Sequence, residues 1–329
     1  MRVLVTGGSG FLGKRLGKTL RENGNDVFLG ARNHKQLLLA QKYSGCETLP
    51  LDVVDRDSVR RTLKTLQPDI IIHAAATKFV DYAEKDPMEC CDINILGTMN
   101  VAKEAIANNT KLVLGISTDK ACPPIRNIYG MSKAVMEKLF CGMDKQNLGP
   151  HFICVRYGNV AWSTGSVLPE WRKTVKKDKI LRTSGPDMYR FFFTVSEAVD
   201  LVMFALEYAA KETGLVIGKR MKAAKMIRIA KMMCDKIEYL PRRPGDREAE
   251  YLIGETEIPY TSQYLDSRDN NLYFFFRPNM QKELPAPGDK LTPDIETKAK
   301  EPLSSINTEQ LSDSEIETLL SSIPEEELG

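Results

Sequence analysis

The sequence predicts an α/β protein, in which a doubly wound parallel sheet carries helices on both faces and is followed by a smaller C-terminal cap. Two observations predict this fold. Over the first 160 residues, short apolar runs alternate with stretches of helical periodicity, which is the pattern of a parallel sheet covered by helices. The first apolar run also ends in glycines that open a helical stretch. We therefore divide the chain into a sheet domain (1–160, its sheet completed by later segments), a region that is mostly cap (161–280), and an acidic linker with a terminal helix (281–329).

Each expected strand of the sheet domain is an apolar run of a length suited to a buried strand. The first is rich in valine and leucine and ends at the glycines. In chain order, the expected strands cover residues 2–6, 26–30, 46–52, 68–73, 111–117 and 152–156.

The expected helices lie between these strands. The first spans 11–23, because Leu12, Leu16 and Leu20 share one stripe and Gly24 can end the helix. The other helices of the sheet domain are expected at 58–66, 87–108 and 127–143.

The alternation becomes looser after residue 160. We expect helices at 169–177 and 196–210, a strand at 190–194, and a methionine-rich amphipathic helix at 221–234. Residues 280–302 have the composition of a linker. Ser312 and Glu315 then form a capping-box pattern. A short docked helix is expected there, because an apolar stripe follows at Ile316, Leu319, Leu320 and Ile323.

Composition excludes several classes of protein. The chain has 329 residues and a net charge of +2, but residues 281–329 carry −8 and the rest carries +10. These charges are dispersed and no recognition motif is present, so we expect no nucleic-acid partner. No apolar run reaches the roughly 20 residues of a membrane helix, and the N-terminus opens directly into a strand, so we expect no membrane segment. The three histidines are scattered and the seven cysteines contain no CxxC, which predicts no metal site and a reducing, cytoplasmic location.

The glycine-rich turn predicts a dinucleotide site. Gly7, Gly10 and Gly13 follow a strand and open a helix, which is the context that a Rossmann-type phosphate loop requires. The glycines allow a tight turn, close approach of the backbone to a pyrophosphate, and packing of the helix on the strand. The alternative is a plain strand-to-helix turn. The candidate loop residues are Thr6, Gly7, Ser9, Gly10, Phe11, Leu12 and Gly13.

The end of the second strand predicts which dinucleotide binds. NAD-binding proteins place an acid there, whereas this chain has Arg32 and Lys35 and no acid, which favours the 2′-phosphate of NADP over NAD. The alternative for Arg32 is a solvated surface cation. Asp52 and Val53 follow the next strand and are candidates for the adenine. A helix N-cap at Asp52 or Asp55 is the alternative.

Tyr129 and Lys133 form a YxxxK pair. On a helix this spacing puts both side chains on one face, and an ammonium near a phenol lowers its pKa. Tyr129 is therefore a candidate general base, and Lys133 a candidate for holding the nicotinamide ribose. Chance occurrence on a helix surface is the alternative.

A polar group ends the preceding strand, where this sheet type forms its ligand crevice. Ser117, Thr118, Asp119 and Lys120 stand there and could supply a hydrogen bond, an acid and a base. A turn with a surface ion pair is the alternative.

Five blocks, in conserved order over residues 1 to about 260, resemble the extended short-chain dehydrogenase/reductase superfamily. They are TGGSGFLG, HAAATKFVDYAEKDPMEC, STDKACPPIRNIYGMSK, VRYGNVAWSTGSVLPEW and GPDMYRFFFTVSEAVDLV. More closely, the chain resembles the inverting UDP-N-acetylglucosamine 4,6-dehydratases of capsule and flagellin-glycan biosynthesis. Epimerases of the superfamily usually lack the Asp-Lys pair, and retaining dehydratases usually carry Asp-Glu.

The resemblance implies a mechanism. Tyr129 takes the proton of the sugar 4-hydroxyl while the C4 hydride passes to NADP⁺. Lys120 then removes the C5 proton, Asp119 helps to expel the C6 hydroxyl as water, and Thr118 bonds the 4-oxygen. The hydride returns to C6, which yields a UDP-2-acetamido-2,6-dideoxy-4-hexulose inverted at C5.

Further contacts are implied more loosely by the same resemblance. Ala74, Ala75 and Ala76 would line the cofactor. The residues implied for the substrate are Lys78, Asn159, Ser166, Arg190, Arg243, Asp246 and Glu250. For Lys78 the alternative is a surface cation, and for Asn159 a turn residue.

The sequence also allows two other functions, and it bears on the oligomeric state and on the acidic tail. An NDP-sugar 4-epimerase or retaining dehydratase would use the same scaffold, and a non-catalytic NADP-binding scaffold would not need Tyr129, Lys133 or Lys120. The resemblance implies a homo-oligomer, either a dimer or a hexamer. The acidic tail is expected to dock on the basic body of its own chain or of a neighbour.

Overall fold

The computed structural model describes residues 1–242, 245–280 and 297–324. Its centre is a ten-stranded sheet in the order β16-β14-β15-β10-β6-β5-β4-β1-β2-β3. The strands from β3 to β10 are parallel, and β15, β14 and β16 continue the sheet antiparallel. The bounds of these strands are Arg2–Thr6 (β1), Asp26–Ala31 (β2), Glu47–Pro50 (β3), Ile70–His73 (β4), Leu112–Ile116 (β5), His151–Arg156 (β6), Val216–Lys219 (β10), Thr261–Asp266 (β14), Asn271–Phe276 (β15) and Thr297–Lys298 (β16).

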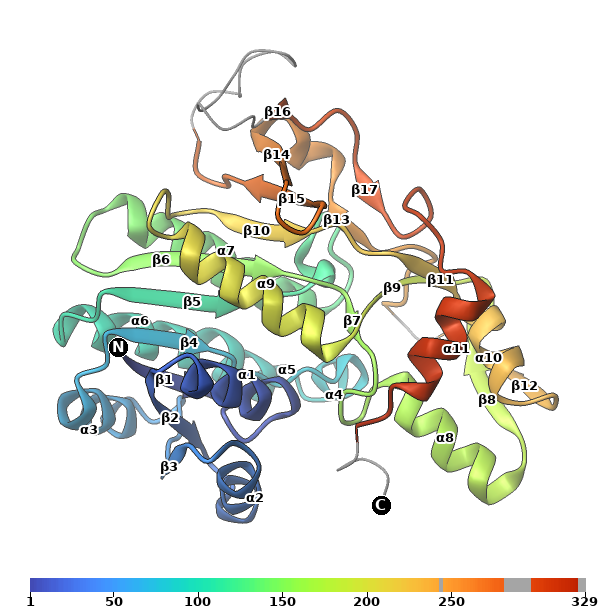
Figure 1. The fold of residues 1–329 in the computed structure, drawn as a ribbon, viewed down its shortest axis with the longest axis horizontal. Coiled ribbons are helices and arrows are strands. Elements are labelled where there is room, and N and C mark those ends of the chain that lie inside the picture. Colours follow the sequence, from blue (N-terminus) through green and yellow to red (C-terminus); the bar gives the residue numbers. More distant parts are fainter. Residues whose placement is uncertain (243–244, 281–296, 325–329) are drawn as a thin grey trace.

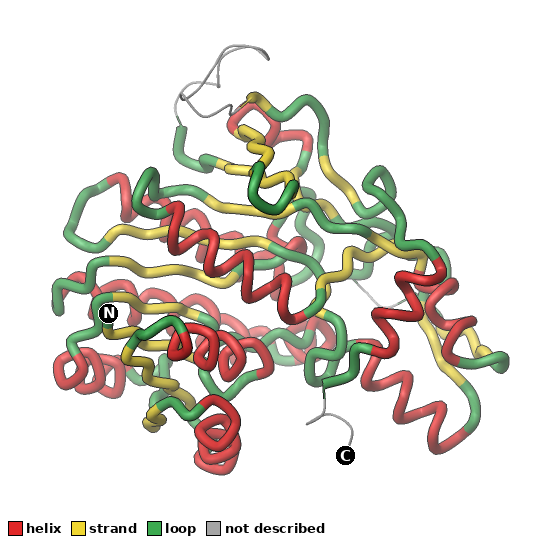
Figure 2. Tube along the Cα trace, in the orientation of Figure 1, coloured by secondary structure: helices red, strands yellow, loops and turns green. Residues whose placement is uncertain are grey.

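Helices cover both faces of this sheet (Figures 1 and 2), so the predicted doubly wound fold is confirmed. The apolar side chains of α1 (Phe11–Glu22), α2 (His34–Ser44) and α9 (Val195–Tyr208) pack on one face. Those of α3 (Arg56–Leu66), α6 (Gly97–Ala107) and α7 (Ile128–Lys145) pack on the other. The strand order reverses at β1, and in such sheets the ligand crevice lies beyond the carboxyl ends of the strands at that point.

A smaller lobe lies beside these carboxyl ends (Figure 1). Its own apolar core includes Trp162, Leu168, Trp171, Phe192 and Ile229. Short sheets are formed by β7 (Asn159–Val160), β9 (Tyr189–Phe193) and β11 (Ala223–Lys225), by β8 (Leu181–Ser184) and β12 (Ile237–Leu240), and by β13 (Tyr251–Ile253) and β17 (Leu303–Ser304). The helices of this lobe are α8 (Val167–Asp178), α10 (Met226–Met233) and α11 (Asp313–Ser321).

Several elements of the region 161–280 belong to the large sheet and not to a cap. Strands β10, β14 and β15 extend the large sheet, and α9 covers it. The strand β10 (Val216–Lys219) was not expected, because four residues between turns give little periodicity. The boundaries proposed for the three regions stay a prediction.

Two expected helices differ from the structure. The helix expected at 221–234 is shorter, because residues 223–225 form β11 and pair with β9 before α10 begins. The two alanines of β11 are apolar and suit either state, and the pairing with β9 decides. The helix expected at 87–108 consists of three consecutive helical segments: α5 (Pro87–Cys91), the π-helical η1 (Asp92–Leu96) and α6. A short helix, α4 (Val80–Lys85), precedes them.

The C-terminal helix docks on the small lobe of its own chain. Ser312 and Glu315 form the predicted capping box at the start of α11, and Ile316 and Leu319 are buried. Trp162 Nε1 donates a hydrogen bond to Leu319 O at 2.8 Å. The expected docked helix is therefore confirmed, with its own chain as the receiving surface.

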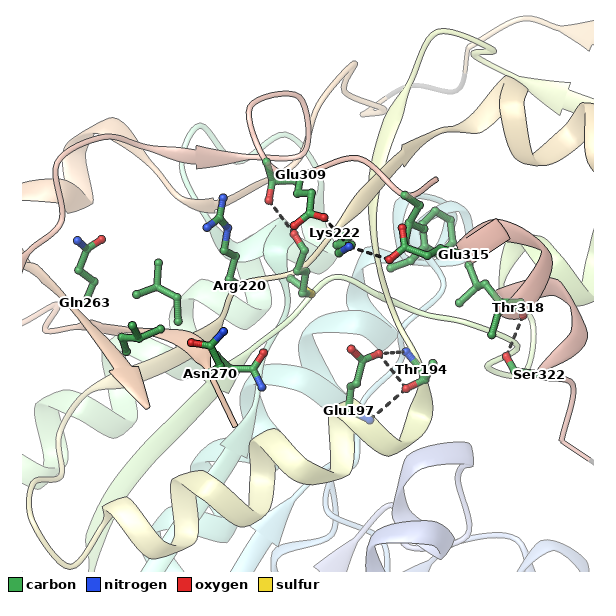
Figure 3. Close-up of a pocket in the computed structure, with 18 of the residues that line it drawn as sticks. Thr194, Glu197, Arg220, Lys222, Gln263, Asn270, Glu309, Glu315, Thr318 and Ser322 are labelled. Carbon is green, nitrogen blue, oxygen red and sulfur yellow. Dashed lines mark hydrogen bonds and ion pairs between the residues drawn. The ribbon is translucent and has the colours of Figure 1, made fainter. Parts of the chain in front are cut away.

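Charge pairs add to this docking (Figure 3). Lys222 lies between Glu309 and Glu315, with Nζ–O distances of 2.5 and 2.7 Å, and Arg228 contacts Asp313 at 2.6 Å. A cavity of about 840 Å³ separates this segment from the β14–β15 hairpin. Of the sequence-predicted site residues that the structure describes, none lines it.

Replacing Ile316 with Ala should lower the stability of the protein. Ile316 is fully buried, and truncation of a buried Ile typically costs about 2–5 kcal/mol. Urea unfolding would measure the change. The exposed Glu317 on the same helix supplies the control, and Glu317→Ala should leave the midpoint nearly unchanged. Equal midpoints for both variants would contradict the docked position of α11.

Candidate active site

The glycine loop has the geometry of a phosphate loop. Gly7 has φ +67°, and a Cβ there would lie 2.7 Å from Ala75 N. A Cβ on Gly13 would lie 2.6 Å from Gly7 O, so the helix packs directly on the turn. Gly10 is the N-cap of α1 and offers no side-chain cap, which leaves the backbone N–H groups of the first turn available to a ligand.

A buried hydrogen-bond chain supports this loop. Thr6 Oγ1 bonds His73 Nδ1 at 2.9 Å and accepts from Ala75 N at 3.2 Å. His73 Nε2 contacts Thr98 Oγ1 at 3.0 Å. Burial lowers the pKa of His73 to about 3, with help from Lys133, so the ring is neutral. His73 and Thr98 thus hold Thr6 and the turn in place, a role that sequence reasoning missed because a lone histidine carries no pattern.

Substituting Gly7 with Ala should abolish dinucleotide binding, because the new Cβ meets backbone atoms and the backbone angle is left-handed. Titration of protein fluorescence with NADP⁺ and NAD⁺ would measure the loss. Gly142→Ala on α7 is the control, because its Cβ would meet nothing closer than 3.6 Å. Unchanged affinity in Gly7→Ala would show that the loop does not hold the ligand.

The end of β2 places the cationic residues as expected. Arg32 and Lys35 are exposed at the start of α2, and Asn33 caps that helix by accepting from Gln36 N at 3.0 Å. Asp52 accepts from Val54 N at 3.0 Å, so its carboxylate closes a turn in this structure. Asp55 is the N-cap of α3, which was the alternative role.

The polar group after β5 forms a buried cluster. Lys120 Nζ lies 3.0 Å from Asp119 Oδ1, and Thr118 Oγ1 donates to the same oxygen at 2.9 Å. Asp119 is fully buried, and its Oδ2 has no hydrogen-bond partner among the described residues. A buried carboxylate oxygen without a partner is costly, which is typical of an atom that meets a ligand.

Lys120 is also held from the small lobe. Its Nζ lies 3.8 Å from Glu250 Oε1 and 3.5 Å from Asn159 Oδ1, and Arg190 lies 3.9 Å from Glu250. Burial alone would lower the pKa of Lys120, but Asp119 and Glu250 hold it above its ordinary value. Lys120 is therefore an ammonium in this state.

The YxxxK pair lies where it was expected, at the start of α7, which Asn127 caps. Its electrostatics differ from the expectation. Burial raises the pKa of Tyr129 to about 12, and the groups that oppose this rise are Lys120 and the hydrogen bond with Thr118. Lys133 donates to Ile116 O at 2.8 Å, and burial lowers its pKa to about 8. The cation that favours a Tyr129 phenolate here is therefore Lys120, not Lys133.

A second buried network connects the end of β5, which carries Thr118 to Lys120, with helix α7, which carries Tyr129. Arg156 on β6 pairs with Glu137 on α7 at 2.6 Å and with Glu257 at 2.8 Å. Ser117 Oγ, next to Thr118, donates to Glu137 at 2.5 Å. The network thus joins the end of β5 to the helix that carries Tyr129. Glu137 and Glu257 were missed, because neither stands in a motif.

The remaining candidate residues differ in their burial. Ser166 is the N-cap of α8, and its buried Oγ lacks a partner among the described residues. Lys78 is exposed, with Nζ 5.8 Å from the ring of Phe79. Asp246 is partly buried, whereas Arg243 lies outside the described residues. The neighbouring Arg247 was missed, yet it is buried and approaches Glu250 at 3.7 Å.

Two features are absent from the described residues. These residues contain no group of three or more metal-ligating side chains arranged to bind an ion. No helix within them combines the length and apolar character needed to cross a bilayer.

Comparison with known proteins places the chain in a family. Residues 3–268 match the model of a polysaccharide biosynthesis protein. A UDP-glucose 4-epimerase of Rickettsia bellii is 31% identical over 297 residues, covering 83% of this chain and 86% of that protein. An inverting UDP-N-acetylglucosamine 4,6-dehydratase of Campylobacter jejuni is 31% identical over 271 residues, covering 80% of each.

The fold also matches a solved structure over its whole length. Pen from Bacillus thuringiensis has a TM-score of 0.85 and 24% identity, and the match covers 100% of this chain and 98% of that one. With the glycine loop, the polar cluster after β5 and the family match together, the chain belongs to the polysaccharide biosynthesis protein family, among relatives that are sugar-nucleotide epimerases and dehydratases.

Proposed function

We propose that the protein is an inverting UDP-N-acetylglucosamine 4,6-dehydratase that uses NADP. The observation that carries this proposal is the buried Asp119–Lys120 pair beside Tyr129. Oxidation at C4 alone needs one base, whereas removal of water across C5 and C6 needs a further base and an acid. The pair supplies both in one place.

The residues around the crevice fit a nicotinamide dinucleotide. The compressed turn at Gly7 and Gly13 leaves the N-terminus of α1 open, and Lys133 lies one helical turn from Tyr129. Bound there, NADP⁺ would supply reversible hydride transfer.

The chain's own residues would divide the remaining work. Tyr129 accepts the proton of the 4-hydroxyl, favoured by the nearby Lys120 charge. Lys120 takes the C5 proton after it has lost its own. Asp119, once it carries the proton that Lys120 has given up, donates that proton to the departing C6 hydroxyl, which leaves as water, and Thr118 bonds the 4-oxygen. Lys120 can lose its ammonium proton to Asp119 along their hydrogen bond. This transfer leaves a neutral amine beside a neutral carboxylic acid.

A second candidate is a UDP-sugar 4-epimerase. The relative from Rickettsia bellii favours it, and Tyr129 with Lys133 would suffice for it. It gives no task to a buried Asp-Lys pair. A non-catalytic scaffold explains neither Tyr129 nor Lys120. The homo-oligomeric state and the cytoplasmic location stay predictions.

Incubation with UDP-N-acetylglucosamine and NADP⁺ tests the proposal. Mass spectrometry should show a sugar nucleotide that has lost one water. The same mass with a changed chromatographic position would indicate the epimerase instead, and unchanged substrate in the presence of bound cofactor would indicate the scaffold.

Arg32→Ala should weaken binding of NADP⁺ and leave NAD⁺ binding nearly unchanged, because only NADP carries the 2′-phosphate that a guanidinium binds. Calorimetric titration with both dinucleotides measures the difference. Lys42→Ala, at the far end of α2, is the control. Equal losses for both dinucleotides, or none, would contradict the choice of NADP.

A further inference from the structure

Among the described residues, the carboxylate of Glu250 lies close to three cations and accepts a hydrogen bond from none of them. It precedes β13 and is 3% exposed. Its carboxylate lies 3.8 Å from Lys120, 3.9 Å from Arg190 and 3.7 Å from Arg247. Oε2 of Glu250 and Nη1 of Arg247 lack hydrogen-bond partners among the described residues. The interaction is therefore purely one of charge.

The two arginines are fixed by backbone groups. Arg190 donates to Tyr189 O at 2.8 Å and to Arg247 O at 2.9 Å. Arg247 donates to Cys122 O at 3.0 Å. An arginine keeps its proton in a protein, so Lys120 is the only one of the three cations whose charge can change.

The C-terminal segment holds Glu250 in this place. Ser305 N donates to Glu250 O at 2.8 Å, and Glu250 N donates to Ser305 Oγ at 3.0 Å. Ser305 Oγ in turn donates to Tyr189 O at 2.9 Å, next to Arg190. The adjacent Ser304 instead bonds Asn307. The segment after the linker thus reaches the backbone that carries the charge cluster.

We propose that Glu250 is a positioning residue that acts through Lys120, as the second carboxylate that holds the lysine's charge, and that Ser305 keeps Glu250 there. The inference deepens the proposed function, because a carboxylate beside the amine favours the ammonium that forms when Lys120 takes the C5 proton. That step breaks the C5–H bond, forms an N–H bond and leaves the electron pair with the 4-keto sugar, so no other reactant is needed.

The charged and titratable groups that face Lys120 define the expected pH effect. Asp119 and Glu250 favour the ammonium form of Lys120, and Arg190 opposes it. Tyr129 has a pKa of about 12, so it is neutral at lower pH. Glu250→Gln removes one of the two anions and keeps the side chain's size. Removal of an opposite charge at this distance shifts a pKa by about 1–3 units, so Lys120 should lose its proton at a correspondingly lower pH.

The experiment follows Lys120 directly. In protein labelled with ¹³C-lysine, the Cε signal of Lys120, assigned with Lys120→Arg, is titrated with pH. We expect the midpoint to fall by about 1–3 units in Glu250→Gln, to return in Glu250→Asp, and to stay in place in Glu248→Gln, an exposed acid two residues away. An unchanged midpoint in Glu250→Gln would overturn the proposal.

The pH dependence of water loss is the second readout. The acid limb of the wild-type profile should move to lower pH in Glu250→Gln, with a lower plateau. If Glu250→Gln does not fold, Ser305→Ala should move the acid limb the same way by a smaller amount, and Ser304→Ala should not move it. The same acid limb in the wild type, Ser305→Ala and Ser304→Ala would then overturn the proposal. A wild-type protein that loses no water would reject the proposed function and leave the lysine titration as the test of Glu250.

Discussion

Tyr129→Phe should stop oxidation at C4. The proposed mechanism assigns acceptance of the 4-hydroxyl proton to the Tyr129 hydroxyl, and loss of a general base typically lowers a rate by about 10²–10⁴-fold. Single-turnover measurements of reduced-nicotinamide absorbance, with cofactor and UDP-N-acetylglucosamine, would follow this step alone.

The control for this variant is a second buried tyrosine. Tyr157→Phe removes a hydroxyl from a tyrosine whose pKa burial also raises, and it should leave the rate within a few-fold. The pKa of Tyr129 near 12 adds an expectation. The phenol is neutral at pH 7, so the wild-type rate of C4 oxidation should rise with pH until Tyr129 is ionised in the complex. A Tyr129→Phe rate close to wild type would remove Tyr129 from the mechanism.

Glu137→Ala should strongly destabilise the protein. It leaves the guanidinium of Arg156 buried with one carboxylate instead of two and removes the acceptor of Ser117. Breaking a buried ion pair from one side typically costs about 3–5 kcal/mol. The midpoint of urea unfolding measures this loss.

An exposed ion pair supplies the comparison. Glu170 contacts Lys173 at 2.8 Å on the surface of α8, and such pairs contribute about 0–1 kcal/mol. Glu170→Ala should therefore leave the midpoint almost unchanged. A similar small effect of Glu137→Ala would mean that the Arg156 network does not hold β5 and α7 together.

The sheet domain was predictable because its signals are local. The strand at Arg2–Thr6 and the helix that begins at Phe11 were expected at those positions, since apolar runs and glycines mark them in the chain. Strand β11 was not, because its state depends on pairing with β9, whose paired residues lie 32 to 36 positions earlier in the chain. The helix α2 was also missed, because exposed leucines at positions 38 and 39 blur its apolar stripe.

The candidate site divides in the same way. Asp119, Lys120 and Tyr129, which stand within motifs, were predicted as site residues, and the structure places them together. Their charge states could not be read from the sequence, since the pKa values of Tyr129 and Lys133 depend on burial. Spacing suggested that Lys133 assists Tyr129, whereas the folded chain places Lys120 in that role. Glu250 was expected to meet the substrate, and its position against Lys120 is a product of long-range packing.

Proton NMR of the product formed in deuterated water tests the central claim most directly. The reaction should convert UDP-N-acetylglucosamine to a 6-deoxy-4-keto sugar that carries deuterium at C5, because Lys120 removes that proton and solvent supplies its replacement. A 6-deoxy-4-keto product with the original C5 proton would contradict elimination through Lys120. A mixture of UDP-N-acetylglucosamine and its 4-epimer, with no water lost, would contradict the dehydratase itself.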